Sequence, residues 1–195
     1  MLNFTALISY SLITTFTPGP NNIMSMSNAS RYGFKKSIPF NIGVCFGFLA
    51  IILLSGIFSA TLYHIIPSVK PVMTYIGAAY ILWLAWKIYR SKAKGEAKRE
   101  GHTNTFLSGF FLQFVNPKGI LYGITTMSTF ILPYTKSIPL IAVISLMLAL
   151  IAFLSTSCWS LFGAVFQRLL AKHARVINII MALLLVYCAV SLFHN

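Results

Sequence analysis

Residues 17–22 read Thr-Pro-Gly-Pro-Asn-Asn, and residues 116–118 read Asn-Pro-Lys. Each stretch interrupts an apolar run of about 28 residues, although roughly 20 apolar residues suffice for a helix to cross a bilayer. A proline lacks the backbone donor and clashes with the preceding turn, so each helix must stop or kink there. In hydrocarbon such a break is tolerated only where it lines a protein-walled or wet cavity. A pair of broken helices in two halves of a chain indicates a transporter's central binding site.

The composition is typical of an integral membrane protein. Hydrophobic residues make up 57% of the 195 residues and charged residues 9%, whereas about 25% of an average soluble chain is charged. Fifteen Lys and Arg oppose two acids. We attribute this excess to membrane orientation rather than to nucleic-acid binding, because the basic residues cluster between apolar stretches. Both acids, Glu96 and Glu100, share one polar segment, so no carboxylate lies in a predicted span. The three isolated cysteines lack metal-ligand spacing, and we expect no metal and no cofactor.

The hydropathy pattern predicts an all-α protein of six transmembrane helices in a single domain, 1–195. The predicted helices cover residues 3–29, 38–63, 72–89, 105–132, 140–166 and 176–193. The first and fourth are broken in mid-membrane. Residues 1–90 and 105–195 are predicted to form two inverted three-helix repeats, joined by a polar cytoplasmic linker at 91–104. The sequence Lys-Ser-Ile-Pro occurs at both 36–39 and 136–139, which gives weak support to the repeats.

Basic residues are distributed unequally among the predicted loops. The loops after the second and fourth helices hold only Lys70 and Lys136. Twelve basic residues lie in or beside the other three loops: Arg31, Lys35, Lys36, Lys87, Arg90, Lys92, Lys94, Lys98, Arg99, Arg168, Lys172 and Arg175. Because cytoplasmic loops carry the excess of Lys and Arg, we expect both termini to lie outside the cytoplasm.

The two breaks provide the candidate binding residues. A helix N-terminus carries unpaired amides and a partial positive charge, so it attracts anions. Asn116 and Pro117 suit the first positions of a new half-helix, as Pro20 does after Gly19. Together with Lys118, the breaks predict a positive pocket for a substrate carboxylate, and carbonyls that end the preceding half-helices could hold an ammonium. The candidate substrate-binding residues are Pro18, Gly19, Pro20, Asn21, Asn22, Asn41, Gln113, Asn116, Pro117 and Lys118.

Lys118 has a second predicted role. A lysine at mid-span is costly to insert, and burial favours its neutral form, so Lys118 is also the candidate for proton coupling. The alternative is a lysine that reaches water or a carbonyl by snorkelling. For Asn21 and Asn22 the alternative is capping of the broken helix. Gly43 and Gly47 are expected to allow close helix packing, and Tyr122 and residues 155–157 are expected to pack or to form interhelical hydrogen bonds.

Several motifs resemble the LysE/RhtB superfamily of small amino-acid exporters. They are TPGPNN at 17–22, GFKKS at 33–37, NIGVCFGF at 41–48, GAAYILWLAWKI at 77–88 and NPK at 116–118. Within that superfamily, LQFVN at 112–116, LYGIT at 121–125, FQR at 166–168 and LLLVYCAV at 183–190 are similar to exporters of cysteine and O-acetylserine.

The resemblance covers essentially the whole chain and implies a six-helix protein of the bacterial inner membrane. It implies export of cysteine, O-acetylserine and related small neutral amino acids, driven by the proton motive force, and it is compatible with a homodimer. Two other classes stay open as alternatives. One is an ungated pore for small polar solutes. The other, an intramembrane enzyme, is disfavoured because the chain offers neither an acid dyad nor a metal site for such chemistry.

Overall fold

A computed structural model of the chain describes residues 3–57, 75–76, 78–90, 104–166 and 173–191. These residues are helical throughout, apart from short turns, which confirms the all-α fold class. The helices are α1 (Phe4–Phe16), α2 (Pro20–Tyr32), α3 (Phe34–Ile57), a helix over residues 78–89, α5 (Phe106–Val115), α6 (Pro117–Thr125), the π-helix η1 (Thr126–Ile131), α7 (Ile138–Val165) and α9 (Ala174–Ser191).

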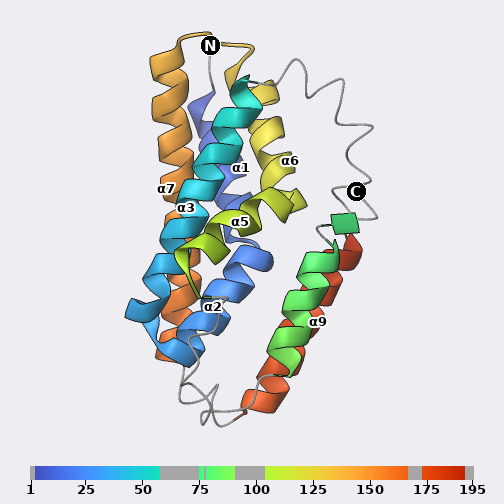
Figure 1. The fold of residues 1–195 in the computed structure, drawn as a ribbon. Helices are drawn as coiled ribbons and strands as arrows, with labels where there is room; N and C mark the ends of the chain where they lie inside the picture. The colour runs from blue at the N-terminus through green and yellow to red at the C-terminus, as the bar shows by residue number, and fades with distance from the viewer. Residues whose placement is uncertain (1–2, 58–74, 77, 91–103, 167–172, 192–195) are drawn as a thin grey trace.

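Both predicted helix breaks are present. Residues 17–19 separate α1 from α2, and Asn116 alone separates α5 from α6. Each second half-helix begins at a proline, Pro20 or Pro117, where the missing backbone donor costs nothing. In Figure 1, α2 and α6 both begin in the middle of the molecule and run toward opposite ends.

The predicted loop between residues 29 and 38 is wrong. Helix α2 continues to Tyr32 and α3 begins at Phe34, so Gly33 alone turns the chain. Its φ of 87° lies in the left-handed region, which glycine adopts without steric cost, and its N–H donates to the carbonyl of Ala29. Basic residues near the turn indicated a loop, but they sit on helices that end and start there.

Three further features of the prediction differ from the structure or lie outside the described residues. Residues 36–39 lie inside α3, whereas residues 136–139 span the start of α7, so the two Lys-Ser-Ile-Pro motifs do not occupy equivalent places. After residue 125 the α-helix changes to a π-helix, which periodicity did not predict. Parts of the predicted helices, at 58–63, 72–74, 77 and 192–193, and most of the linker lie outside the described residues.

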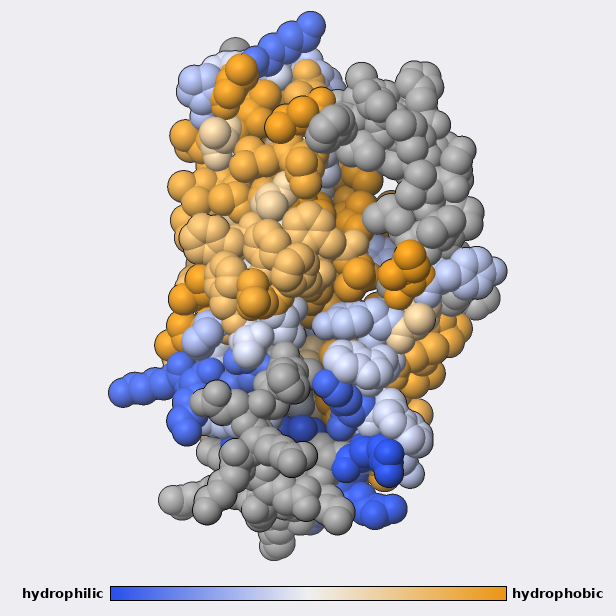
Figure 2. Space-filling view, in the orientation of Figure 1, coloured by the Kyte–Doolittle hydropathy of each residue, from blue (hydrophilic) through white to orange (hydrophobic). Residues whose placement is uncertain are grey.

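The surface of the described residues is apolar and much of the interior is polar. Large hydrophobic side chains face outward along α1, α5, α7 and α9, for example Ile13 at 68% exposure and Phe111 at 60%. Figure 2 shows this hydrophobic surface as a broad orange region, with hydrophilic residues gathered mainly at the lower end. Helices α3 and α7 are each long and apolar enough to cross a membrane. Such a surface is typical of a protein whose solvent is lipid.

Helix α2 has the opposite character because it is polar and lies inside. Asn22, Ser25, Ser27 and Asn28 are all buried along it. It packs on α3 and α7 and also contacts α9. Figure 1 shows the helix of residues 78–89 and α9 as a pair beside the other helices, and apolar residues of this pair share a core cluster with α2, α3 and α5.

Glycines allow the central helices to approach closely. A Cβ at Gly43 or Gly109 would clash with the carbonyl oxygen of the facing helix, from Phe106 and Phe40 respectively. A Cβ at Gly47 would clash with α5 in the same way. The predicted packing role of Gly43 and Gly47 is therefore confirmed, and the close contact of α3 with α5 fixes the position of the second helix break.

Candidate functional site

A cavity lies where the two helix breaks meet. It has a volume of about 410 Å³, part of which is open to the surroundings. Residues from α1, α2, α3, α6 and α7 and both breaks line it: Thr14, Thr15, Gly19, Pro20, Asn21, Asn22, Phe48, Asn116, Lys118, Gly119, Tyr122, Ala152 and Thr156. Two segments almost 100 residues apart in the sequence thus form one site. None of these lining residues is acidic.

The starts of α2 and α6 bring backbone donors to the cavity. Gly19 and Asn116 are the N-cap residues, and neither N-terminus has a side-chain cap hydrogen bond. Within the described residues, the first bonded amide of α2 is that of Ile23, which donates to the carbonyl of Gly19. At α6 the amides of Gly119 and Ile120 already donate to the Asn116 carbonyl, so Lys118 has the one unpaired amide there. Unpaired amides at a helix N-terminus attract an anion, and the two N-termini line the same cavity.

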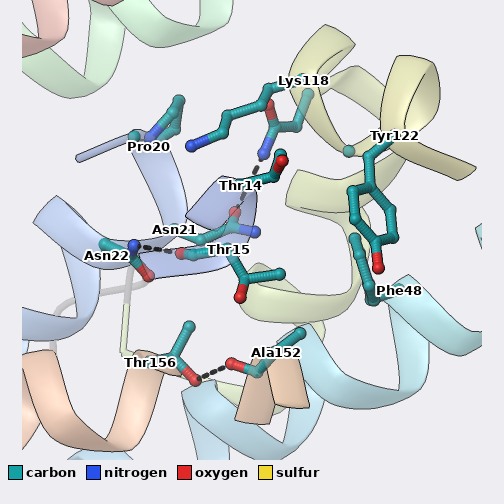
Figure 3. A pocket seen from close by; sticks show the side chains of 13 residues that line it. Thr14, Thr15, Pro20, Asn21, Asn22, Phe48, Lys118, Tyr122, Ala152 and Thr156 are labelled. Atoms are coloured by element: carbon teal, nitrogen blue, oxygen red, sulfur yellow. Dashed lines mark hydrogen bonds between the residues drawn. The ribbon is translucent and has the colours of Figure 1, made fainter. Parts of the chain in front are cut away.

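Lys118 supplies the positive charge of the site. Its Nζ donates to Thr17 Oγ1 at 2.8 Å and to the Thr17 carbonyl at 3.2 Å. Figure 3 shows its side chain crossing the upper side of the cavity toward Pro20. A Cβ at Gly19 would lie 3.3 Å from Nζ, so the absence of a side chain at position 19 leaves room for the ammonium group.

Three side-chain amides form a hydrogen-bonded cluster beside Lys118. Asn21 and Gln113 exchange two hydrogen bonds, of 2.9 and 3.1 Å. Asn116 Nδ2 donates to the same Asn21 Oδ1 at 3.1 Å. The cluster joins α2 to α5 and to the start of α6. Gln113 does not line the cavity; it orients Asn21, which does.

The carbonyl groups at the end of α1 already have donors. Asn22 Nδ2 donates to the carbonyls of Thr15 and Thr17 at 2.7 and 2.9 Å. From α7, Ser155 donates to Thr15 and Trp159 donates to Phe16. Asn22 therefore acts as the predicted cap of the broken helix. In this arrangement the carbonyls that were expected to hold an ammonium accept hydrogen bonds from side chains instead.

The opposite side of the cavity is mostly apolar. Phe48 and Tyr122 form one wall, and Ala152 and Thr156 form the floor in Figure 3. The Thr156 hydroxyl donates to the carbonyl of Ala152 at 3.1 Å. The Tyr122 hydroxyl donates to Ser11 Oγ at 2.7 Å, as expected for interhelical bonding. The cavity thus has a cationic, amide-rich side and a side of small or aromatic surface.

Not every candidate residue lines the cavity. Pro18 is exposed, and Pro117 is buried without lining the cavity. Asn41 lies in a separate buried cluster, where it accepts from Ser25 Oγ at 2.9 Å and donates to Ser160 Oγ at 2.9 Å. That cluster ties α2, α3 and α7 together. Sequence reasoning assigned Tyr122 and Thr156 to packing or hydrogen bonding and did not predict the remaining lining residues, because nothing distinguishes them from other residues of apolar helices. They are Thr14, Thr15, Phe48, Gly119 and Ala152.

An apolar exterior, a buried polar helix and a cavity between two broken helices define a membrane translocator. The chain belongs to the LysE family: the LysE type translocator family matches residues 12–195. The expectations of LysE superfamily membership and of a transporter rather than an enzyme are therefore confirmed.

Similar proteins carry the name "Cysteine/O-acetylserine efflux protein". The protein of that name from Salmonella typhimurium (strain LT2) is 47% identical over 189 residues, which cover 97% of this chain and 96% of the relative. The proteins from Escherichia coli (strain K12) and Shigella flexneri serotype 5b are 45% identical with the same coverage. No solved structure matches the chain.

Proposed function

We propose that this chain exports cysteine, O-acetylserine and related small neutral amino acids across the bacterial inner membrane. The names of relatives that are 45–47% identical over nearly the full length support these substrates. The shape of the cavity supports the same class of solute. Its apolar side, formed by Phe48, Tyr122, Ala152 and Thr156, fits a short uncharged side chain better than a long or charged one.

The observation that carries the proposal is the position of Lys118. Its ammonium group lies beside a cavity where α2 and α6 both begin, and no acidic residue lines that cavity. The site therefore has an unmatched positive charge that a substrate carboxylate would neutralise. In this scheme the carboxylate replaces Thr17 as the partner of Lys118, and the free amides at the two helix N-termini assist it. Pro18, Pro20 and Pro117 serve the site by ending and starting the half-helices.

The transport cycle is alternating access around this cavity. Two inverted three-helix repeats, 1–90 and 105–195, would rock about the breaks, with residues 91–104 as the cytoplasmic linker. The opposite directions of α2 and α6 support this symmetry. We propose that the proton motive force drives export and that Lys118 carries the proton, because no carboxylate is present in the spans to do so.

Efflux measurements test the proposal. Cells that overproduce the protein are loaded with a panel of radiolabelled amino acids, and efflux is followed with and without an uncoupler. Uncoupler-sensitive efflux of cysteine and O-acetylserine supports the proposal. Equal efflux in cells that lack the protein contradicts it.

Counterflow in proteoliposomes separates a carrier from an ungated pore, the second candidate class. The binding site of a carrier reorients across the membrane faster when substrate occupies it. Unlabelled substrate on the far side should therefore accelerate uptake of the labelled substrate. An open pore should show no acceleration.

A further inference from the structure

One backbone carbonyl fixes the direction of the whole amide cluster. Gln113 Nε2 donates to the carbonyl of Gly109 at 3.0 Å, and a carbonyl can only accept. The nitrogen of the Gln113 amide is therefore identified, and its oxygen must accept from Asn21 Nδ2. Asn21 Oδ1 then faces two donors, Gln113 Nε2 and Asn116 Nδ2.

In this series of hydrogen bonds one acceptor has no donor. Asn116 uses its Nδ2 toward Asn21, so its Oδ1 points away from the cluster. Asn116 is 2% exposed, and its Oδ1 has no hydrogen-bond partner. Turning the amide over would place two oxygens, Asn116 Oδ1 and Asn21 Oδ1, against each other. A buried carbonyl without a donor costs free energy, and this one belongs to a residue that lines the cavity.

The carbonyls at the end of α1 already accept hydrogen bonds from side chains. Side chains occupy the carbonyls of Thr15, Phe16 and Thr17, as described above. The Thr17 carbonyl also accepts from Lys118. Among the described side chains that line the cavity, Asn116 alone has a buried polar atom without a partner. One acceptor of a residue in the cavity wall, Asn116 Oδ1, therefore has no hydrogen-bond donor.

We propose that Asn116 Oδ1 binds the α-ammonium group of the transported amino acid. This inference rests on the proposed function and adds the second half of substrate recognition: Lys118 and the helix N-termini hold the carboxylate, and Asn116 holds the ammonium. A neutral amide oxygen can accept from the ammonium group without adding a second buried ion to the site. Asn116 thus selects amino acids against acids of the same shape that lack the amino group.

The test compares reduced cysteine with 3-mercaptopropionate, which keeps the thiol and the carboxylate but lacks the amino group. In proteoliposomes, each compound competes with radiolabelled cysteine for the wild-type protein. A hydrogen bond to a charged group corresponds to about a 10- to 100-fold preference, so we expect cysteine to compete better by that factor. Equal competition by the two compounds would overturn the inference and leave the proposed function standing.

Substitution then assigns the preference to the residue. Asn116→Leu keeps much of the side-chain volume and removes no side-chain cap of α6, although it also loses the bond to Asn21 Oδ1. We expect this variant to favour cysteine by no more than about 3-fold, a loss of most of the hydrogen-bond preference. Ser128→Ala, at an exposed position of η1, should keep the wild-type preference. Asn116→Ala repeats the measurement should the leucine variant fail to insert. A full preference in either Asn116 variant contradicts the role of Asn116, whereas absence of cysteine transport by the wild type contradicts the proposed function itself.

Discussion

Lys118 exchanges partners in the proposed cycle, and the chemistry of its present partner makes the exchange feasible. Thr17 offers a hydroxyl and a carbonyl, both neutral. The bonds to Thr17 are charged only on the lysine side, whereas a substrate carboxylate adds a full negative charge opposite the ammonium group. A carboxylate therefore competes well with Thr17. When the substrate leaves, Lys118 returns to Thr17 before it releases its proton in the proposed cycle. The lysine is thus satisfied both with and without substrate.

Substitutions at Gly19 test whether the Lys118 ammonium group needs the free space beside it. Its backbone is extended, with φ −170°, so a side chain there causes no backbone strain. A Cβ would lie 3.3 Å from Lys118 Nζ, so Gly19→Ala requires a shift of a few tenths of an ångström. We expect a small loss of cysteine transport in Gly19→Ala. In Gly19→Val, whose branches reach further toward the ammonium, we expect a loss of about 10-fold, equivalent to one charged hydrogen bond. Equal rates in the two variants and the wild type would contradict this contact.

At the scale of single residues, the sequence predicted the polar side of the site and not the apolar side. Asn21, Asn22, Asn116 and Lys118 were identified because a proline break exposes whatever polar groups lie beside it. Ala152 and Thr156 carry no such signal. They line the cavity only because α7 packs against α1 and α3, and that packing connects residues more than 100 positions apart.

At the scale of elements, the breaks were predictable and the joints between helices were not. A proline lacks its donor in any context, so the starts of α2 and α6 follow from the sequence alone. The turn at Gly33 depends on one residue with positive φ. The flanking basic residues led to the prediction of a longer loop instead. The π-helix after residue 125 has no composition cue. None of its residues lines the cavity.

A continuous first helix should abolish transport. Changing Pro18, Gly19 and Pro20 together to Ala supplies three residues that favour helix. The amides of Asn21 and Asn22 would then bond within the helix and be lost to the substrate. We expect efflux of labelled cysteine to fall at least about 10-fold, in line with the loss of a charged hydrogen bond, while the protein still inserts into the membrane.

Pro139→Ala is the matched control for that variant. Pro139 lies in the first turn of α7, where it is exposed and does not line the cavity. Its substitution should leave efflux near the wild-type rate. Normal efflux in the triple variant would contradict the need for a broken helix.

At the scale of the whole molecule, the charged residues lie beyond one end of the hydrophobic region. Figure 2 shows most hydrophilic residues at the end where α2 meets α3, below the hydrophobic region. Arg31, Lys35 and Lys36 lie at that junction. The unequal charge predicted from the sequence thus corresponds to one end of the structure, which we propose faces the cytoplasm. The termini would then both lie in the periplasm.

Cysteine labelling tests this orientation. Lys136 and Lys35 are both exposed and lie on opposite sides of the membrane in the proposal. In intact cells, an impermeant maleimide should label Lys136→Cys above the wild-type background and should not label Lys35→Cys. After the cells are opened, both variants should react. Labelling of Lys35→Cys in intact cells would reverse the proposed topology.

The most direct test of the account is the efflux of labelled cysteine from cells that produce Lys118→Ala, compared with Lys136→Ala, which removes an exposed lysine outside the cavity. The account predicts that Lys118→Ala inserts normally and loses at least about 10- to 100-fold in transport, the equivalent of one charged hydrogen bond, while Lys136→Ala transports like the wild type. Wild-type efflux in Lys118→Ala would contradict the claim that two broken helices and this lysine form the carboxylate site.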